Sequence, residues 1–359
     1  MQKALTYTMK LLHSADWHLD APLTGRTPEQ AALLRKAALS LPDKIAELCR
    51  RENCDLMLLS GDLFDGPYTK ESVSAVKSAL AEAGVPVFIA PGNHDPYCSD
   101  SPWVREIWPE NVRIFTQQAV QSVVLPDLDC RIYGAAFTKP YADGILEGFR
   151  ANCDERYAIG IFHGDASQPD SPYCPITTLQ VQESGLDYLA LGHIHKGGQF
   201  CAGSTLCAWP GCPMGRGYDE TGEKGALIVT LEGSAESWFI PLGLPRFYDK
   251  SCTVDALPSV LPPSPTIDFY RITLTGESEP VDMEELSRRF SYIPNLEFRD
   301  RTVAPLDIWG SAGQDTLEGL YFSLLHSAME QQDEKAARQV LLAARISRQI
   351  LNGQEVQLP

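Results

Sequence analysis

Long apolar runs and paired cysteines are both missing from this 359-residue sequence. No stretch of about 18 apolar residues occurs, so no membrane-spanning helix is predicted. The ten cysteines are scattered without a CxxC pair, and no basic and apolar leader opens the sequence, so we expect reduced thiols in the cytoplasm. Basic residues are also in deficit, with 30 Lys and Arg against 47 Asp and Glu. The net charge of −17 therefore offers no global attraction for a nucleic-acid backbone.

Histidine is scarce as well, but five of the seven histidines lie in short motifs that also supply Asp or Asn. The motifs, in order, are Ser14-Ala15-Asp16-Trp17-His18, Gly61-Asp62-Leu63-Phe64-Asp65, Gly92-Asn93-His94-Asp95, Phe162-His163-Gly164-Asp165 and Gly192-His193-Ile194-His195. Each follows a short apolar run that predicts a buried strand, at residues 10–13, 56–59, 85–90, 158–162 and 188–191. The motifs are therefore expected at strand ends, where open α/β sheets collect their functional groups.

The residue types in these motifs indicate a metal site. Imidazole, carboxylate and one amide oxygen suit Mn, Fe or Zn, and no thiolate is present in the set. Two such ions ~3.5–4 Å apart can hold the attacking and leaving oxygens of a displacement at phosphorus. Asp62, in the middle of the series, is our choice for a carboxylate that bridges two ions. A single D-x-H or G-H-x-H is more often structural, so the prediction depends on all five motifs occurring together.

Taken together, the motifs resemble those of the calcineurin-like metallophosphoesterases: D-x-H, G-D-x-x-D, G-N-H-D or G-N-H-E, a lone His, and G-H-x-H. The resemblance implies an α/β fold, a four-layer α/β/β/α sandwich. It also implies two divalent metal ions. One would be held by Asp16, His18, Asp62 and His195, and the other by Asp62, Asn93, His163 and His193. His94 matches the family's catalytic histidine, which stabilises the transition state or protonates the leaving oxygen, and Asp65 would orient and charge it.

Within that family the sequence is similar to the SbcD-type DNA repair exonucleases, in particular the YhaO-like members. The similarity lies in residues 14–20, in residues 61–65 and in the Gly-rich stretch 209–225; it covers most of residues 9–245 and is thin beyond. It implies Mn-dependent hydrolysis of DNA phosphodiesters in the 3′ to 5′ direction by a bridging hydroxide. It further implies an SbcC-like coiled-coil ATPase as partner and a homodimer. Arg216 and Tyr218 are candidate substrate contacts, although the Gly-rich stretch could equally be only a turn.

Two alternatives remain open at this point. A phosphodiesterase for a small substrate, such as a cyclic nucleotide or a nucleotide-sugar, predicts a closed pocket roofed by the C-terminal domain. A regulatory subunit of an SbcC-like ATPase predicts little turnover, and the complete ligand set argues against it. Substitutions such as Asp62→Ala or His94→Gln separate an enzyme from a scaffold.

The domain organisation follows from periodicity and proline content. Residues 1–245 are expected to form the metallophosphoesterase domain, with helices at 29–52, broken near Pro42, and at 71–83. Prolines between 245 and 265 then mark a linker or loop. Residues 246–359 are expected to form a smaller α+β accessory domain with strands at 267–275 and 296–303, a helix at 283–290 and two final helices, the last at 333–352. Its apolar stripe, Ala337, Val340, Leu341, Ala344 and Leu351, is expected to pack within this domain, and its arginines, Arg338, Arg345 and Arg348, are expected to form a solvated face.

Overall fold

The computed structural model describes residues 8–152 and 154–356. Contacts divide the chain into two compact units. The first unit comprises Met1–Asp249 with Ile267–Arg271, and the second comprises Lys250–Thr266 with Ile272–Pro359. The predicted domain boundary lies at residue 245, and the first unit extends slightly past it, to Asp249.

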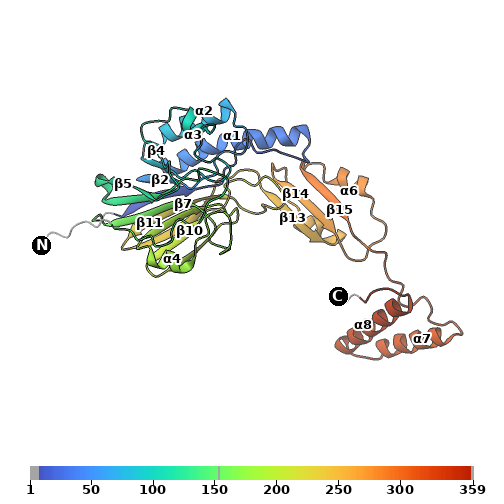
Figure 1. The fold of residues 1–359 in the computed structure, drawn as a ribbon. Coiled ribbons are helices and arrows are strands. Elements are labelled where there is room, and N and C mark those ends of the chain that lie inside the picture. The colour runs from blue at the N-terminus through green and yellow to red at the C-terminus, as the bar shows by residue number, and fades with distance from the viewer. Residues whose placement is uncertain (1–7, 153, 357–359) are drawn as a thin grey trace. The chain divides into compact units, whose positions relative to one another are not determined.

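Two six-stranded sheets form the centre of the first unit (Figure 1). The strands of one sheet are, in spatial order, β12 (Ser234–Pro241), β11 (Gly225–Glu232), β1 (Met9–Ser14), β2 (Leu56–Leu59), β3 (Val87–Ile89) and β4 (Val112–Ile114). Those of the other are β5 (Gln121–Leu125), β6 (Cys130–Gly134), β7 (Tyr157–His163), β8 (Tyr188–Gly192), β10 (Thr205–Trp209) and β9 (Gly198–Ala202). Strands β1 to β4 run parallel, and so do β6, β7, β8 and β10. The motif-bearing ends of the parallel strands therefore share one edge of each sheet.

Alternate residues along these strands face two different cores. One set, including Leu58, Phe88 and Ile159, is buried between the sheets. The opposite set packs on helices: α1 (Pro28–Arg51) and α2 (Lys70–Glu82) cover the first sheet, and α4 (Thr178–Glu183) covers the second. Each large side chain buried in this way contributes about 1.5–3 kcal/mol. The helices lie outside the sheets (Figure 1), so the predicted four-layer α/β/β/α fold is confirmed.

Helix α1 differs from its prediction. It begins with a capping box formed by Thr27 and Gln30 and continues to Arg51 without a break, so the interruption predicted at Pro42 is wrong. Proline lacks the donor for a helical hydrogen bond, which costs about 3 kcal/mol. Here Leu41 and Ile45, on either side of Pro42, are fully buried against the first sheet. Burial of Leu41 and Ile45 stabilises the helix by more than the missing hydrogen bond destabilises it.

The remaining elements include two helices that pack on each other. The remaining helices are α3 (Pro102–Arg105), α5 (Leu257–Val260), α6 (Met283–Arg289), α7 (Leu317–Glu330) and α8 (Glu334–Leu351), and 3₁₀ turns lie at Pro126–Leu128 and Val254–Ala256. A third sheet has the order β13 (Phe247–Cys252), β14 (Phe269–Leu274) and β15 (Leu296–Asp300). Helices α7 and α8 form a hairpin with Phe322 and Ala344 buried. Within the described ranges, no helix has both the length and the apolar character needed to cross a membrane.

Two expectations for the final helix need correction. Ala344 is buried as predicted, but Leu341 and Leu351 of the same stripe are 39% and 57% exposed. The arginines do not form one solvated face either. Arg348 is buried, with its guanidinium 3.9 Å from the centre of the Phe322 ring, and it donates to the Ile308 carbonyl. The Arg348 guanidinium stabilises the hairpin because it stacks on an aromatic ring and donates to a carbonyl. The spacing of the charged residues in the sequence did not indicate this contact.

Candidate metal centre

All five motifs lie directly after, or at the end of, parallel strands. Asp16 and His18 follow β1, and Asp62 follows β2. Asn93 and His94 follow β3, His163 ends β7, and His193 and His195 follow β8. The two sheets face each other, so their motif-bearing ends bring residues from distant parts of the chain to one place.

Four of the predicted ligands have backbone conformations that residues other than glycine rarely adopt. The φ angles are +56° at Asp16, +44° at His18, +52° at Asp62 and +92° at His193. Each such residue costs about 1–3 kcal/mol and persists only where the surroundings impose it. Gly92 shows how close the loops approach, because a Cβ atom there would collide with Oδ1 of Asp62. The fold holds these side chains at the expense of local strain.

The ligand atoms converge on one buried region. Three groups have ligand atoms within 4.8 Å of one another: Asp16, His18 and His195; His18, Asp62 and His94; and Asp16, Asp62 and His163. The Nε2 atoms of His18 and His195 are 3.0 Å apart. Nε2 of His163 lies 3.2 Å from Oδ2 of Asp62 and 2.9 Å from Oδ1 of Asn93. Two imidazole nitrogens so close repel each other unless a proton or a cation lies between them.

Outer hydrogen bonds select the tautomer of each of these histidines. Nδ1 of His163 is 2.8 Å from the Ser60 carbonyl oxygen, and Nδ1 of His195 is 2.7 Å from Oε1 of Glu220. Nδ1 of His18 is 3.2 Å from Oδ2 of Asp65. Each Nδ1 can donate only if it carries the proton, which leaves the lone pair on Nε2 for the centre. The donor set therefore fits divalent cations.

Charge in the centre also favours a cation. Burial alone would raise the pKa of Asp62, but His163 and His18 more than offset it, and the pKa lies well below its usual value. Burial works to lower the pKa of His163, yet the carboxylates of Asp62 and Asp16 raise it to about 9. The buried carboxylates thus draw positive charge to this point, and a metal ion supplies that charge without protonating a ligand.

His94 lies at the exposed edge of this region. Its side chain is 44% exposed, and Nδ1 is 3.0 Å from Oδ1 of Asp65. That hydrogen bond raises the pKa of His94 above its ordinary value. Asp65 bonds His18 with its other oxygen, so one carboxylate joins the buried centre to the exposed histidine. The pKa of Asp65 is lowered by both histidines, which keeps it ionised.

The remaining predicted site residues are His193, Arg216 and Tyr218. The side chain of His193 belongs to none of the three groups; its ring lies 5.3 Å from that of His163 and 4.9 Å from that of Tyr173. Its backbone N–H instead donates to Asp16. Arg216 reaches the centre, with Nη1 3.5 Å from Oδ2 of Asp65. The Tyr218 ring packs edge-on against the Phe247 ring, with the ring centres 5.2 Å apart.

Two residues near the centre were not assigned a role from the sequence. Asp95 is buried, and its carboxylate accepts hydrogen bonds from the backbone N–H groups of Asp62, Leu63, Phe64 and Gly92. It fixes the loop after β2 to the loop after β3. Its place in the Gly92-Asn93-His94-Asp95 motif is a signal that could have indicated it. Glu220 positions His195 and has no comparable signal in the sequence.

We expect Glu220→Gln to weaken metal binding about 10- to 100-fold, the usual effect of losing a carboxylate that orients a ligating histidine. The carboxylate accepts from Nδ1 of His195 at 2.7 Å and from the Arg216 guanidinium at 2.7 Å. Titration of metal-free protein in competition with a chelator measures the affinity. Glu223→Gln, which changes the same charge at a carboxylate that is 62% exposed, is the control. Equal affinity in the two variants would show that Glu220 does not orient His195.

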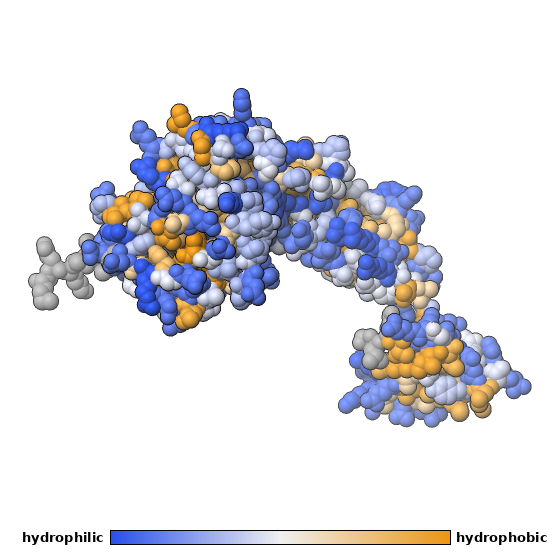
Figure 2. Space-filling model, in the orientation of Figure 1, coloured by the Kyte–Doolittle hydropathy of each residue, from blue (hydrophilic) through white to orange (hydrophobic). Residues whose placement is uncertain are grey.

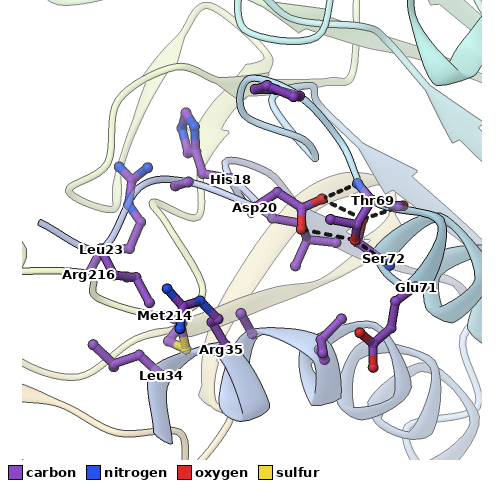
Figure 3. Close-up of a pocket in the computed structure, with 15 residues that line it drawn as sticks. His18, Asp20, Leu23, Leu34, Arg35, Thr69, Glu71, Ser72, Met214 and Arg216 are labelled. Carbon is purple, nitrogen blue, oxygen red and sulfur yellow. Dashed lines mark hydrogen bonds between the residues drawn. The ribbon is translucent and has the colours of Figure 1, made fainter. Parts of the chain in front are cut away.

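A partly apolar recess opens beside His18. It has a volume of 280 Å³ and is lined in part by Leu23, Leu34, Met214 and Arg216 (Figure 3). Asp20 also lines it, but its carboxylate accepts from the backbone N–H of Thr69 and from the Ser72 hydroxyl. Thr69 is the N-cap of α2, so Asp20 secures the start of that helix. The wall of this recess is therefore supported by α1 and α2.

Comparison with known proteins gives the family. The sequence pattern of the calcineurin-like phosphoesterases matches residues 9–197, which include all five motifs. The uncharacterized metallophosphoesterase YhaO of Bacillus subtilis (strain 168) is 32% identical over 239 residues, which are 62% of this chain and 57% of that protein. This chain thus spans little more than half the length of that relative.

Solved structures are also similar, at low sequence identity. A dimetal phosphatase from Danio rerio is 14% identical with a TM-score of 0.42, and the protein TT1561 of Thermus thermophilus is 12% identical with a TM-score of 0.39. Each comparison covers 65% of this chain and 99% of the other. The match over residues 9–197 takes in more than half of the sequence. The chain belongs to the calcineurin-like phosphoesterase family, hydrolases that use divalent metal ions.

Proposed function

We propose that this phosphoesterase is a metal-dependent DNA exonuclease of the SbcD type, which removes nucleotides in the 3′ to 5′ direction and acts in DNA repair. The proposal of metal-dependent hydrolysis rests on one observation. Three histidines direct their Nε2 lone pairs into the centre, because a hydrogen bond at Nδ1 fixes the tautomer of each. Manganese is the proposed metal, with iron or zinc as alternatives that the same ligand types accept. The resemblance in sequence supports DNA as the substrate.

The proposed ligand sets follow the family pattern. Asp16, His18, Asp62 and His195 would hold one ion, and Asp62, Asn93, His163 and His193 would hold the other. When bound, the ions would stabilise negative charge that develops on the phosphoryl oxygens. Burial lowers the pKa of His193 to about 4, so its imidazole is neutral and has the lone pair that a metal needs.

His94 is the proposed general acid. It lies at the exposed edge of the centre, where a leaving group departs, and Asp65 holds its Nδ1. The raised pKa keeps a proton on the imidazole at higher pH than for a free histidine. From this position Nε2 of His94 can give its proton to the departing sugar oxygen.

Hydrolysis by the purified full chain tests the proposal. The substrates are single- and double-stranded linear DNA labelled at either end, bis-p-nitrophenyl phosphate, cyclic nucleotides and a nucleotide-sugar, each with added Mn. Release of nucleotides from the 3′ end supports the proposal. Cleavage of the small substrates alone would transfer the function to a small-molecule phosphodiesterase. No turnover on any substrate would favour a regulatory subunit.

We also propose that the hairpin of α7 and α8 binds the coiled coil of an SbcC-like ATPase. Leu317, Leu320 and Leu324, spaced along one side of α7, are 86%, 58% and 62% exposed. Ile350 and Leu351 of α8 are 60% and 57% exposed. Figure 2 shows apolar side chains gathered on this hairpin. An apolar helical surface of this kind suits an amphipathic helix of a partner.

Leu320→Glu combined with Leu324→Glu is expected to abolish co-elution with such an ATPase, because two charges would be buried without partners. Size-exclusion chromatography with light scattering measures both this complex and the homodimer that the resemblance implies. Leu179→Glu is the control, since Leu179 is also 62% exposed but belongs to α4 of the first unit. Co-elution that survives the double change would contradict this docking surface.

A further inference from the structure

A second recess, polar and 690 Å³ in volume, adjoins the metal centre. Its lining, all within the first unit, includes Tyr218, three arginines and three carboxylates: Arg26, Arg216, Arg271, Asp65, Asp219 and Glu220. Asp65 and Arg216 also belong to the surroundings of the metal centre. A ligand group in this recess would therefore lie beside the reacting atoms.

Arg26 is held in this recess mainly by aromatic rings. Its guanidinium carbon is 4.9 Å from the centre of the Phe247 ring, 5.3 Å from that of Tyr218 and 5.8 Å from that of Phe269. One nitrogen donates to the Arg216 carbonyl oxygen at 3.2 Å. Among the described residues, the buried Nε of Arg26 has no hydrogen-bond partner. Ring faces orient a guanidinium but do not neutralise it, so its full charge remains for a ligand.

Arg271 lies on the other side of the same tyrosine. Its guanidinium carbon is 3.8 Å from the centre of the Tyr218 ring, and Nη1 is 3.6 Å from Oδ2 of Asp249, whose side chain is 42% exposed. Arg216 is also ion-paired, with Glu220 at 2.7 Å and Asp65 at 3.5 Å, so among the described residues Arg26 is the arginine of this recess without an ion-paired carboxylate. The charge that remains for a ligand is thus that of Arg26, which Tyr218 separates from Arg271.

We propose that this recess binds a second phosphate group of the substrate, next to the phosphate that is hydrolysed. Guanidinium groups present paired N–H donors that match phosphate oxygens. The inference rests on the proposed phosphodiesterase function and deepens it, because it requires a substrate with two successive phosphates: a nucleic-acid strand or a pyrophosphate-linked nucleotide. It also shows how a chain with a net charge of −17 can bind a polyanion, through a local site.

Substrates that differ by one phosphate test the proposal. We would compare kcat/KM for a thymidine dinucleoside monophosphate, a thymidine trinucleoside diphosphate and a UDP-sugar, in the unsubstituted chain and in Arg26→Met. The unsubstituted chain should prefer the trinucleoside about 10- to 100-fold, mostly through KM, as expected for a charge-assisted hydrogen bond. Arg26→Met should remove that preference. If the preference and its loss appear with the UDP-sugar instead, the second phosphate belongs to a nucleotide-sugar.

Arg50→Met is the matched control, because Arg50 belongs to the last turn of α1 whereas Arg26 directly precedes the helix. The two positions are about 35 Å apart by the rise of a 24-residue helix. Arg50→Met should keep the preference. Thermal melting checks that each variant is folded, and Arg271→Met replaces Arg26→Met if the latter is not.

Binding in the presence of a chelator separates this inference from the proposed function. Fluorescence anisotropy of a labelled oligothymidylate reports binding without hydrolysis. If the chain with added Mn does not hydrolyse DNA, but binds the oligothymidylate and Arg26→Met weakens this binding about 10-fold or more, the recess is supported and the proposed function is refuted. Hydrolysis with the same substrate preference in Arg26→Met as in the unsubstituted chain would refute the recess and leave the proposed function standing.

Discussion

Asp62→Asn is expected to remove at least one metal ion and to lower hydrolysis of every phosphodiester substrate about 1,000-fold or more. Asp62 is the only residue assigned to both proposed ligand sets, and its Oδ2 lies 3.2 Å from Nε2 of His163 and 3.8 Å from Nε2 of His18. An amide of the same shape has one oxygen and no charge, so it cannot bridge two cations. Charge stabilisation by a metal contributes several kcal/mol, and about 4 kcal/mol corresponds to about 1,000-fold in rate.

Metal content by elemental analysis and kcat/KM on DNA and on bis-p-nitrophenyl phosphate are the measurements. The variant should remain folded, because Asp95 binds the backbone N–H groups at residues 62–64 and not the Asp62 side chain. Asp127→Asn removes the same charge at an exposed position and is the control. Full metal content with full activity in Asp62→Asn would place the reactive centre elsewhere in the chain.

Much of the fold was predictable from the sequence because the parallel strands are short apolar runs that end in motif residues. Residues 56–59 and 158–162, for example, are buried on both faces in β2 and β7 and read as continuous apolar segments. The order of the motifs then specified the four-layer arrangement through the family resemblance. Strands β5 and β10 were not predicted. β5 is an edge strand of mixed polarity, and β10 lies in a segment rich in Cys and Gly.

The details of the centre were harder to predict because they depend on contacts between distant segments. Glu220 orients His195 from a loop after the motifs, and nothing in the spacing of the two residues indicates it. Likewise, Arg26, Tyr218 and Arg271 are far apart in the sequence and meet only after folding. The direction of the His193 side chain is set by a positive φ angle and by the Tyr173 ring, and neither can be read from G-H-x-H.

His94→Gln is expected to lower kcat on DNA about 100- to 10,000-fold while the metal content stays the same. The histidine lies at the exposed edge of the centre with Nδ1 bound to Asp65, so its loss removes a proton donor and leaves the buried ligands in place. The loss should be much smaller on bis-p-nitrophenyl phosphate. p-Nitrophenolate is a stable anion that departs without a proton, whereas a sugar oxygen needs one. This dependence on the leaving group is the signature of a general acid.

Metal analysis decides between this role and a second one that the geometry permits. His94 shares one group of potential ligand atoms with His18 and Asp62, so it could also bind an ion. If His94→Gln loses metal and slows both substrates equally, His94 is a ligand and another group protonates the leaving oxygen. If the metal remains and only the poor leaving group is affected, the proton comes from His94. Asp65→Asn should then slow the poor leaving group in weaker form, because Asp65 orients the His94 imidazole, and it should also weaken metal binding, because its other oxygen holds Nδ1 of His18.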